Sequence, residues 1–121
     1  MVSVYLCDDV PELRRLMRLI LEEDPALCVI GEADEAQTGI EEIAELQPDV
    51  VVLDLSMPGM DGLEALPVIR QTAPDTRVIV FSGFTKERME ALALSSGAHR
   101  YIEKGEPLEH VKQAVHELQR R

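Results

Sequence analysis

The stretch VVVLDL, residues 50–55, decides the fold. Its apolar residues are mostly β-branched, they follow one another without alternation, and the run is too short for an ordinary helix. Such a run is typical of a central strand in a parallel sheet, where both faces of the strand are buried. Asp54 is the one polar residue of the stretch, so a single carboxylate stands near the carboxyl end of this predicted strand.

Four other short segments rich in β-branched residues predict strands, at residues 2–7, 27–33, 78–82 and 100–103. The segments between them carry apolar residues three and four positions apart, which is the spacing of an amphipathic helix. Strict alternation of strand and helix predicts an α/β domain, in which a five-stranded parallel sheet has helices on both faces.

Local signals mark the ends of the predicted helices. Pro11 suits the first turn of the first helix, and Pro107 suits that of the last. Pro67 would cost about 3 kcal/mol inside a helix, so we predict that the third helix begins near Glu64 and holds Pro67 in its first turn. The fourth helix, with Thr85 as its predicted N-cap, has the weakest apolar stripe.

The composition is that of one acidic globular domain. The 121 residues include 12 Lys and Arg against 23 Asp and Glu, for a formal net charge of -11. Such a charge opposes direct binding to nucleic acid or to anionic lipid. The apolar runs are far shorter than a membrane span, and the amino end lacks the pattern of a signal peptide. We therefore expect a cytoplasmic protein in which Cys7 and Cys28 are buried, reduced thiols.

Polar residues stand at the carboxyl ends of the predicted strands. Asp8 and Asp9 follow the first strand, Asp54 lies at the end of the third, Ser82 ends the fourth and Lys104 follows the fifth. Ligands of open α/β sheets bind beyond these ends, at the crevice where the strand order reverses. If strands one, three, four and five are neighbours, the carboxylates, the hydroxyl and the ammonium share one pocket.

Three carboxylates in one pocket need a cation or shared protons, because like charges raise one another's pKa. Carboxylate oxygens suit Mg2+, which keeps several waters and also binds phosphate oxygens. The histidines show no zinc-ligand spacing and are expected at the surface: His99, His110 and His116. The pocket therefore indicates phosphoryl chemistry, in which Asp54 attacks phosphorus while Lys104 and Ser82 contact the phosphoryl oxygens.

The chain resembles the receiver domain of bacterial two-component response regulators over essentially its whole length. The match lies in DD at 8 and 9, VVLDLSMPGMDG at 51–62, FSG at 81–83 and GAHRYIEK at 97–104, and in the spacing of these motifs. The resemblance implies a flavodoxin-like fold with strand order 2-1-3-4-5. It also implies that residues 1–121 form a single receiver domain, with no output domain among them.

The resemblance implies roles for the acidic residues. Asp54 is the phosphoacceptor, which takes a phosphoryl group from a histidine kinase or a phosphotransfer protein. Asp8, Asp9 and Asp54 form an acidic pocket for Mg2+, to which the Ser56 carbonyl oxygen contributes. Asp9 and Asp54 are expected to bind the ion directly, and Asp8 largely through water.

Further roles concern the phosphoryl group and its readout. By the same resemblance, Ser82 and Lys104 contact the phosphoryl group, and Tyr101 stands at the aromatic switch position. Ser56 and Phe84 flank the path of the water that hydrolyses the acyl phosphate. We expect phosphorylation to draw the Ser82 hydroxyl inward, to take the Tyr101 ring away from the surface, and to shift the face formed by the fourth helix, fifth strand and fifth helix.

The wording of MPGMDGLEAL and GAHRYIEK is most similar to receivers that are joined to helix-turn-helix DNA-binding domains. This similarity implies a transcriptional output domain elsewhere in a longer chain, and a homodimer that forms on phosphorylation. The domain itself is expected to be regulatory and not an enzyme, since its chemistry is limited to gaining and losing its own phosphoryl group.

One residue departs from the family's pattern. Receivers commonly follow the lysine with a cis proline, whereas Gly105 follows Lys104 in this chain. Glycine restricts the backbone far less than proline. We therefore expect a more mobile loop around Lys104.

Two alternatives stay open at this point. A haloacid-dehalogenase-like phosphohydrolase also uses a nucleophilic Asp with Mg2+, but it needs an acid/base Asp two residues further on, where this chain has Ser56. A receiver-like interaction module that is never phosphorylated would normally have lost Asp54 or Lys104, and both are present. Turnover of a general phosphatase substrate would support the first alternative, and the absence of any acyl phosphate the second.

Overall fold

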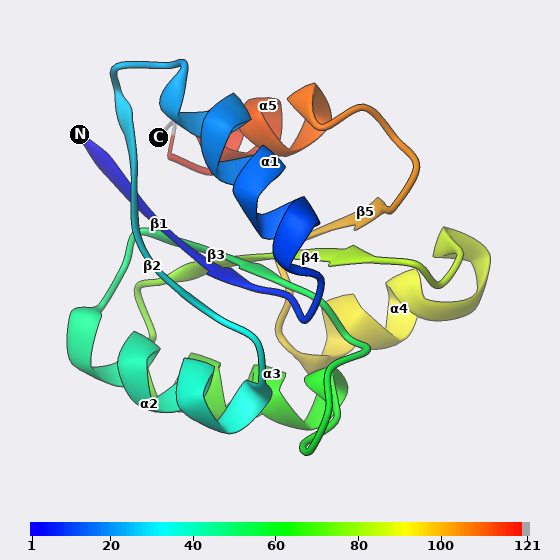
Figure 1. The fold of residues 1–121 in the computed structure, drawn as a ribbon. Helices are drawn as coiled ribbons and strands as arrows, with labels where there is room; N and C mark the ends of the chain where they lie inside the picture. Colours follow the sequence, from blue (N-terminus) through cyan, green and yellow to red (C-terminus); the bar gives the residue numbers. More distant parts are fainter. Residues whose placement is uncertain (120–121) are drawn as a thin grey trace.

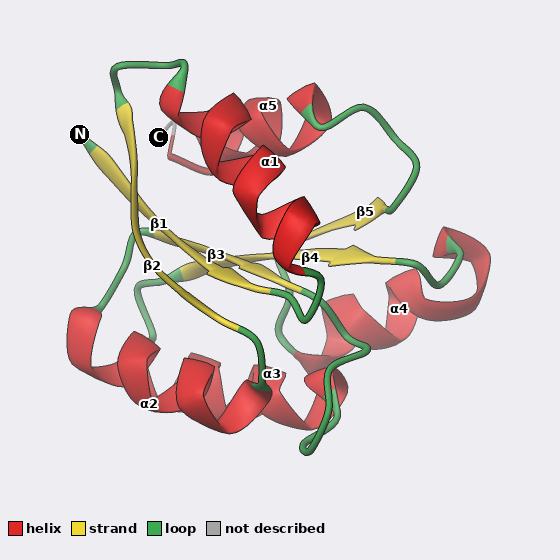
Figure 2. Cartoon of the chain, viewed as in Figure 1, coloured by secondary structure: helices red, strands yellow, loops and turns green. Residues whose placement is uncertain are grey.

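Strands and helices alternate along the whole computed structural model, which describes residues 1–119 (Figures 1 and 2). The strands are β1 (Val2–Cys7), β2 (Leu27–Ala33), β3 (Val50–Leu53), β4 (Arg77–Ser82) and β5 (Arg100–Glu103). The helices are α1 (Pro11–Glu22), α2 (Ala36–Leu46), α3 (Gly62–Thr72), α4 (Lys86–Ser96) and α5 (Glu109–Gln119).

All strand pairs are parallel, and the strand order is β2-β1-β3-β4-β5. This is the order that the resemblance implied, and it makes β1, β3, β4 and β5 neighbours. Every residue of β3 is buried, as its unbroken apolar run predicts. The strand ends at Leu53, two residues before the predicted end, and the Asp54 N–H still donates to the Cys7 carbonyl oxygen at 2.9 Å.

Helices cover both faces of the sheet, as predicted. Helices α1 and α5 lie on one face, and α2, α3 and α4 lie on the other (Figure 1). Each face has its own apolar core, with Leu21 and Val111 on the first side and Tyr5, Ile43 and Leu66 on the second. None of the helices in residues 1–119 is both long enough and apolar enough to cross a membrane.

The start of α3 differs from the prediction. The helix begins at Gly62 and not near Glu64, because Asp61 serves as its N-cap: the Asp61 side chain accepts from the Leu63 N–H at 2.9 Å, and Glu64 completes a capping box. The D-x-x-E pattern is the sequence signal for this start. Pro67 consequently lies inside the helix and not in its first turn.

The ends of α4 and α5 also need correction. Thr85 holds the N-cap position of α4 as predicted, but its side chain makes no capping hydrogen bond. Helix α5 begins at Glu109, two residues beyond Pro107, which lies in the preceding loop. Ala93 is the only buried residue of α4, so α4 is the helix with the weakest attachment to the core, as its apolar stripe predicts.

The burial of the histidines and cysteines differs from the prediction. His99 is half-buried, because its Nδ1 accepts a hydrogen bond from the Val78 N–H at 3.0 Å, so its expected place at the surface is wrong. His116 is half-buried too, and its Nε2 lies 2.7 Å from Asp24 Oδ2. Both cysteines are free. Cys7 is buried, which raises the pKa of its thiol to about 12, whereas Cys28 is only partly covered.

Candidate functional site

Three carboxylates meet at the carboxyl ends of β1 and β3. Asp8, Asp9 and Asp54 each offer an oxygen, and these oxygens lie within 4.8 Å of one another. Asp8 and Asp54 are buried, and Asp9 is exposed. The strand order brings the carboxylates together, as the sequence predicted, because β1 and β3 are adjacent and end at the same edge of the sheet.

Lys104 completes the charge pattern from the end of β5. Its Nζ lies 3.0 Å from Asp8 Oδ2 and 3.2 Å from Asp54 Oδ2. Burial works against the lysine charge, but the two carboxylates outweigh it and raise the pKa of Lys104. Burial raises the pKa of Asp54, although the Ser56 N–H and the Lys104 ammonium oppose this shift. The site thus holds an ammonium between two of its three carboxylates.

Asp54 is held by the backbone around it. Its Oδ1 accepts from the Ser56 N–H at 3.1 Å. The segment then turns back, and the Gly62 N–H donates to the Leu55 carbonyl oxygen at 3.2 Å. A Cβ at Gly62 would lie 2.5 Å from the Leu55 Cα, so only glycine lets the start of α3 pack this closely against the residues that follow β3.

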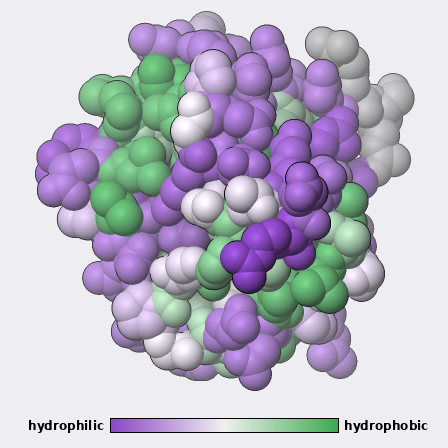
Figure 3. Space-filling view, turned by 90° about the vertical axis from the view of Figure 1, so that its right-hand side faces the viewer, coloured by the Kyte–Doolittle hydropathy of each residue, from purple (hydrophilic) through white to green (hydrophobic). Residues whose placement is uncertain are grey.

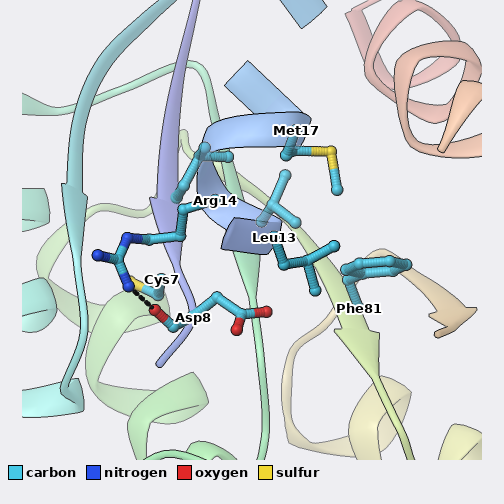
Figure 4. Close-up of a pocket in the computed structure, with 8 residues that line it drawn as sticks. Cys7, Asp8, Leu13, Arg14, Met17 and Phe81 are labelled. Atoms are coloured by element: carbon cyan, nitrogen blue, oxygen red, sulfur yellow. Dashed lines mark hydrogen bonds between the residues drawn. The ribbon is translucent and has the colours of Figure 1, made fainter. Parts of the chain in front are cut away.

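Every polar group of Asp8 has a partner. Its N–H donates to the Ala33 carbonyl oxygen at 3.1 Å, and its carbonyl oxygen accepts from the Arg14 guanidinium at 2.6 Å (Figure 4). Its Oδ1 accepts from the Val10 N–H at 2.9 Å, while Oδ2 faces Lys104. Asp8 is therefore fixed in place, and Asp9 is the carboxylate that remains open to solvent.

The supporting role of Arg14 was not predicted from the sequence. Its Nε lies 2.7 Å from Glu32 Oε1 on β2, and Arg18 holds the other oxygen of Glu32 at 2.8 Å. The two arginines, Arg18 first, hold the pKa of Glu32 below its usual range. A carboxylate within the apolar β2 segment, opposite arginines on α1, is the signal that could have indicated this link.

An apolar hollow lies beside the site, between α1 and the strand ends (Figure 4). Leu13, Met17 and Phe81 line it together with Arg14 and Asp8. The Lys104 ammonium stands 5.9 Å from the centre of the Phe81 ring, a distance at which a cation and an aromatic face attract one another. The low polarity of these neighbours strengthens the pairing of charges next to them.

Ser82 and Tyr101 meet at Phe84. The Phe84 N–H donates to Ser82 Oγ at 3.2 Å, and the Tyr101 hydroxyl donates to the Phe84 carbonyl oxygen at 2.6 Å. The Ser82 carbonyl oxygen accepts from the Lys104 N–H at 2.7 Å. Ser82 is fully buried, and the Phe84 side chain is exposed. This arrangement connects the end of β4 to β5 and to the loop before α4.

Tyr101 does not lie at the surface, where we expected its ring to be before phosphorylation. We expected the ring to leave the surface only on phosphorylation. In this structure the ring is already buried, since only 4% of Tyr101 is exposed. The reason is its hydrogen bond to Phe84, which holds the hydroxyl inside. A switching role of Tyr101 would therefore involve this hydrogen bond.

The site fits a hard divalent cation. Its three clustered carboxylates offer oxygen ligands only, and Mg2+ prefers oxygen, with one or two carboxylates and several waters. Because Asp8 Oδ2 is paired with Lys104 while Asp9 is open, the exposed side of the cluster is the side where an ion has access. The histidines of residues 1–119 do not join this group.

Comparison with known proteins places the chain in a family. The family model for the response regulator receiver domain matches residues 4–116. The chain belongs to this family, and it is a receiver domain of two-component signalling, which is a regulatory domain. Its five-stranded parallel sheet in the order 2-1-3-4-5 is the flavodoxin-like receiver fold.

Individual relatives are response regulators. The chain is 37% identical over 115 residues to the nitrate/nitrite response regulator protein NarL of Escherichia coli K12, which covers 95% of this chain and 53% of that protein. It therefore spans about half the length of this curated relative. Among solved structures, a LuxR-family two-component response regulator from Aurantimonas sp. SI85-9A1 matches with a TM-score of 0.91 and 30% identity, over 98% of this chain and 84% of that one.

A further solved relative is an isolated receiver domain. The isolated REC domain of RcsB from Salmonella enterica serovar Typhimurium, in the presence of phosphomimetic BeF3-, matches with a TM-score of 0.89 and 25% identity. The match covers 98% of this chain and 88% of that one.

Proposed function

We propose that Asp54 accepts a phosphoryl group from a histidine kinase or a phosphotransfer protein. One observation carries the proposal: a buried carboxylate at the end of the central strand lies 3.2 Å from the Lys104 ammonium and within a cluster of two further carboxylates. The membership of the chain in the receiver family supports it.

The step is a displacement at phosphorus. An oxygen of the Asp54 carboxylate forms a P–O bond, and the P–N bond of a phosphohistidine breaks. The bonding electrons leave with the imidazole nitrogen, which takes up a proton. Lys104 and the Ser82 hydroxyl then contact the phosphoryl oxygens and stabilise their charge. The Ser82 hydroxyl is free to donate a hydrogen bond to a phosphoryl oxygen, because it is the acceptor in its hydrogen bond with the Phe84 N–H.

Mg2+ would be held by Asp9 and Asp54, with Asp8 acting largely through water and the Ser56 carbonyl oxygen as a further ligand. When bound, the ion would supply positive charge against the phosphoryl oxygens. The chain's own residues position the carboxylates: Lys104 keeps Asp8 and Asp54 in place, and Arg14 fixes the backbone of Asp8.

Phosphorylation would then shift the face formed by α4, β5 and α5. Ser82, Phe84 and Tyr101 form a continuous path of hydrogen bonds from the site to β5. Leu92 and Leu94 of α4 are exposed, and Figure 3 shows apolar areas between polar ones on one side of the molecule. We infer that this face serves a second receiver or a DNA-binding output domain in a longer chain; the name of one LuxR-family solved relative, a DNA-binding response regulator from Staphylococcus aureus, supports the output. The Phe84 ring is expected to slow hydrolysis of the acyl phosphate.

The two alternatives are less well supported. The family match does not favour a haloacid-dehalogenase-like phosphohydrolase, and Ser56 still stands where that class needs an Asp. A receiver that is never phosphorylated is disfavoured by the close pairing of Asp54 with Lys104.

Reductive trapping tests the proposal and locates the modified residue. The protein is incubated with Mg2+ and acetyl phosphate, treated with borohydride and digested, since borohydride converts an aspartyl phosphate to homoserine. We expect homoserine at position 54. Its absence there, or its appearance at Asp8 or Asp9 instead, would reject Asp54 as the acceptor, and steady release of phosphate from p-nitrophenyl phosphate would favour the phosphohydrolase.

A further inference from the structure

Lys104 lies in a tight turn whose shape depends on Gly105. The Glu106 N–H donates to the Glu103 carbonyl oxygen at 3.1 Å, which closes a four-residue turn with Lys104 and Gly105 at its centre. Gly105 has φ 107, and a positive φ at the third residue of a turn favours glycine. No cis peptide bond occurs in residues 1–119. The turn is therefore built differently from one with a proline after the lysine.

The Glu106 side chain closes the same turn a second time. Its Oε2 accepts from the Glu103 N–H at 2.8 Å, so both backbone polar groups of Glu103 are bonded to Glu106. His110 Nδ1 lies 2.9 Å from the other carboxylate oxygen, Oε1. Glu106 thus connects the strand before Lys104 with the helix after it. We call the two hydrogen bonds between Glu103 and Glu106 the latch. The latch holds the loop that we expected to be more mobile, at the place where the family commonly has a proline.

Glu103 carries the connection to α4. Its Oε1 accepts from the backbone N–H of Lys86, the first residue of α4, at 3.0 Å. The Thr85 side chain leaves this helix end without a cap of its own. A carboxylate at a helix N-terminus is favourable, because it satisfies a free N–H and the helix dipole. The first turn of the weakly packed α4 is consequently anchored to the residue that precedes Lys104.

We propose that Glu106 is a positioning residue, which fixes the turn of Lys104 and, through Glu103, couples that turn to the first turn of α4. The proposal rests on the phosphoacceptor function for its consequence: when Lys104 moves to contact a phosphoryl group, the displacement reaches α4 through Glu103. The hydrogen bonds from Glu106 to Glu103 and from Glu103 to Lys86 form a second connection between the site and α4, besides the hydrogen bonds of Ser82, Phe84 and Tyr101.

Amide hydrogen exchange without any phosphoryl donor tests the latch itself. In Glu106→Ala the Glu103 amide loses its acceptor, and we expect its exchange to become about tenfold faster, which is the scale of one net hydrogen bond. The Lys86 amide should also exchange faster, because Glu103 is no longer held and because the Lys86 ammonium, 3.8 Å from Glu106 Oε2, loses this carboxylate. Glu106→Gln keeps an acceptor oxygen but loses the charge. Restored protection at both amides in this variant assigns the coupling to Glu103 and not to the ion pair with Lys86.

Glu109→Ala is the matched control, because it removes the same charge three residues further on, from a side chain that pairs with Lys112. It should leave both amides unchanged. Parent-like exchange of the Glu103 amide in Glu106→Ala would overturn the latch. Faster exchange at Glu103 with unchanged exchange at Lys86 would overturn the coupling to α4.

The kinetic readout separates this proposal from the proposed function. With acetyl phosphate at saturating Mg2+, Glu106→Ala should label Asp54 several-fold more slowly than the parent, while the Mg2+ concentration for half-maximal rate stays the same. Equal labelling rates would overturn the positioning role. A parent that is never labelled would instead reject the phosphoacceptor function, and the exchange experiment would still decide whether the latch exists.

Discussion

Lys104 Nζ and Asp54 Oδ2 lie 3.2 Å apart, although the two residues are 50 positions apart in the chain. The pair joins the end of the central strand to the end of the edge strand β5, across β4. Only 2% of the Asp54 side chain is exposed, so the lysine compensates a carboxylate that water barely reaches. Asp8 shares the same lysine at 3.0 Å, which leaves the buried pair of carboxylates with more negative charge than one ammonium balances.

This excess of charge predicts that Asp54→Asn stabilises the fold. The substitution removes a desolvated carboxylate that stands beside Asp8 and Asp9, while Lys104 keeps Asp8 as its partner. The free energy of unfolding in urea at pH 7 without Mg2+ should rise by about 1 kcal/mol. The control is Asp75→Asn at an exposed position, which should change little. A lower stability of Asp54→Asn would contradict this view of the pocket.

Mg2+ should stabilise the parent protein and not the Asp9→Ala variant. A ligand that binds only the folded state adds RT ln(1 + [L]/Kd), so an ion at about 100 times its Kd adds about 2.7 kcal/mol. Because Asp9 is exposed, its removal should leave the stability without Mg2+ nearly unchanged. The measurement is the melting temperature with Mg2+ and with excess chelator. An undiminished Mg2+ effect in Asp9→Ala would exclude Asp9 as a ligand.

Replacing Gly105 with the proline that is common in the family should disrupt the turn after Lys104. Proline holds φ near −65°, whereas Gly105 has φ 107, so Gly105→Pro should unfold the turn and slow the labelling of Asp54. A Cβ at Gly105 would meet nothing within 4 Å. Gly105→Ala should therefore lose only the backbone preference, about 1–2 kcal/mol of unfolding free energy. Faster labelling or higher stability in Gly105→Pro would show that the turn adapts to proline.

His99 predicts a pH dependence of stability. Burial, with Arg70 and Arg100 nearby, lowers its pKa below the ordinary 6.5. A lowered pKa in the folded state means that the unfolded chain binds the proton more readily, so this contribution to stability is fully present above pH 6.5 and is lost as the pH falls through the folded pKa. His99→Asn keeps an acceptor for the Val78 N–H but cannot titrate.

The comparison is the free energy of unfolding in urea at pH 7.5 and at pH 5.5, for the parent and His99→Asn. The parent should lose more stability on acidification than the variant. Equal losses would mean that His99 does not titrate with folding. All other acidic and basic groups are common to both proteins, so the difference isolates His99.

Much of the fold could be predicted from the sequence, because its signals are local and periodic. The short apolar run at residues 50–53 is typical of a buried strand, and strict alternation of strand and helix favours a parallel sheet. The meeting of Asp8, Asp54 and Lys104 followed from the strand ends together with the strand order. The family and its strand order came from the resemblance of the motifs.

Features that depend on where a side chain reaches could not be predicted in this way. The support of Asp8 by Arg14, and the capping of α4 by Glu103, join residues on different elements. We predicted a later start for α3 because that start places Pro67 in the first turn. The helix begins at Gly62 instead, and it tolerates proline in its interior. The burial of Tyr101 likewise depends on a backbone oxygen of a neighbouring loop, which no sequence spacing reveals.

The central claim, phosphorylation of Asp54, is tested most directly by the intact mass of the protein after incubation with Mg2+ and acetyl phosphate. The parent should gain the mass of one phosphoryl group, and it should gain none in excess chelator. Asp54→Asn, which cannot form an acyl phosphate, should stay at its starting mass under the same conditions. Equal gains in the parent and in Asp54→Asn, or no gain in the parent, would contradict the assignment of Asp54 as the phosphoacceptor.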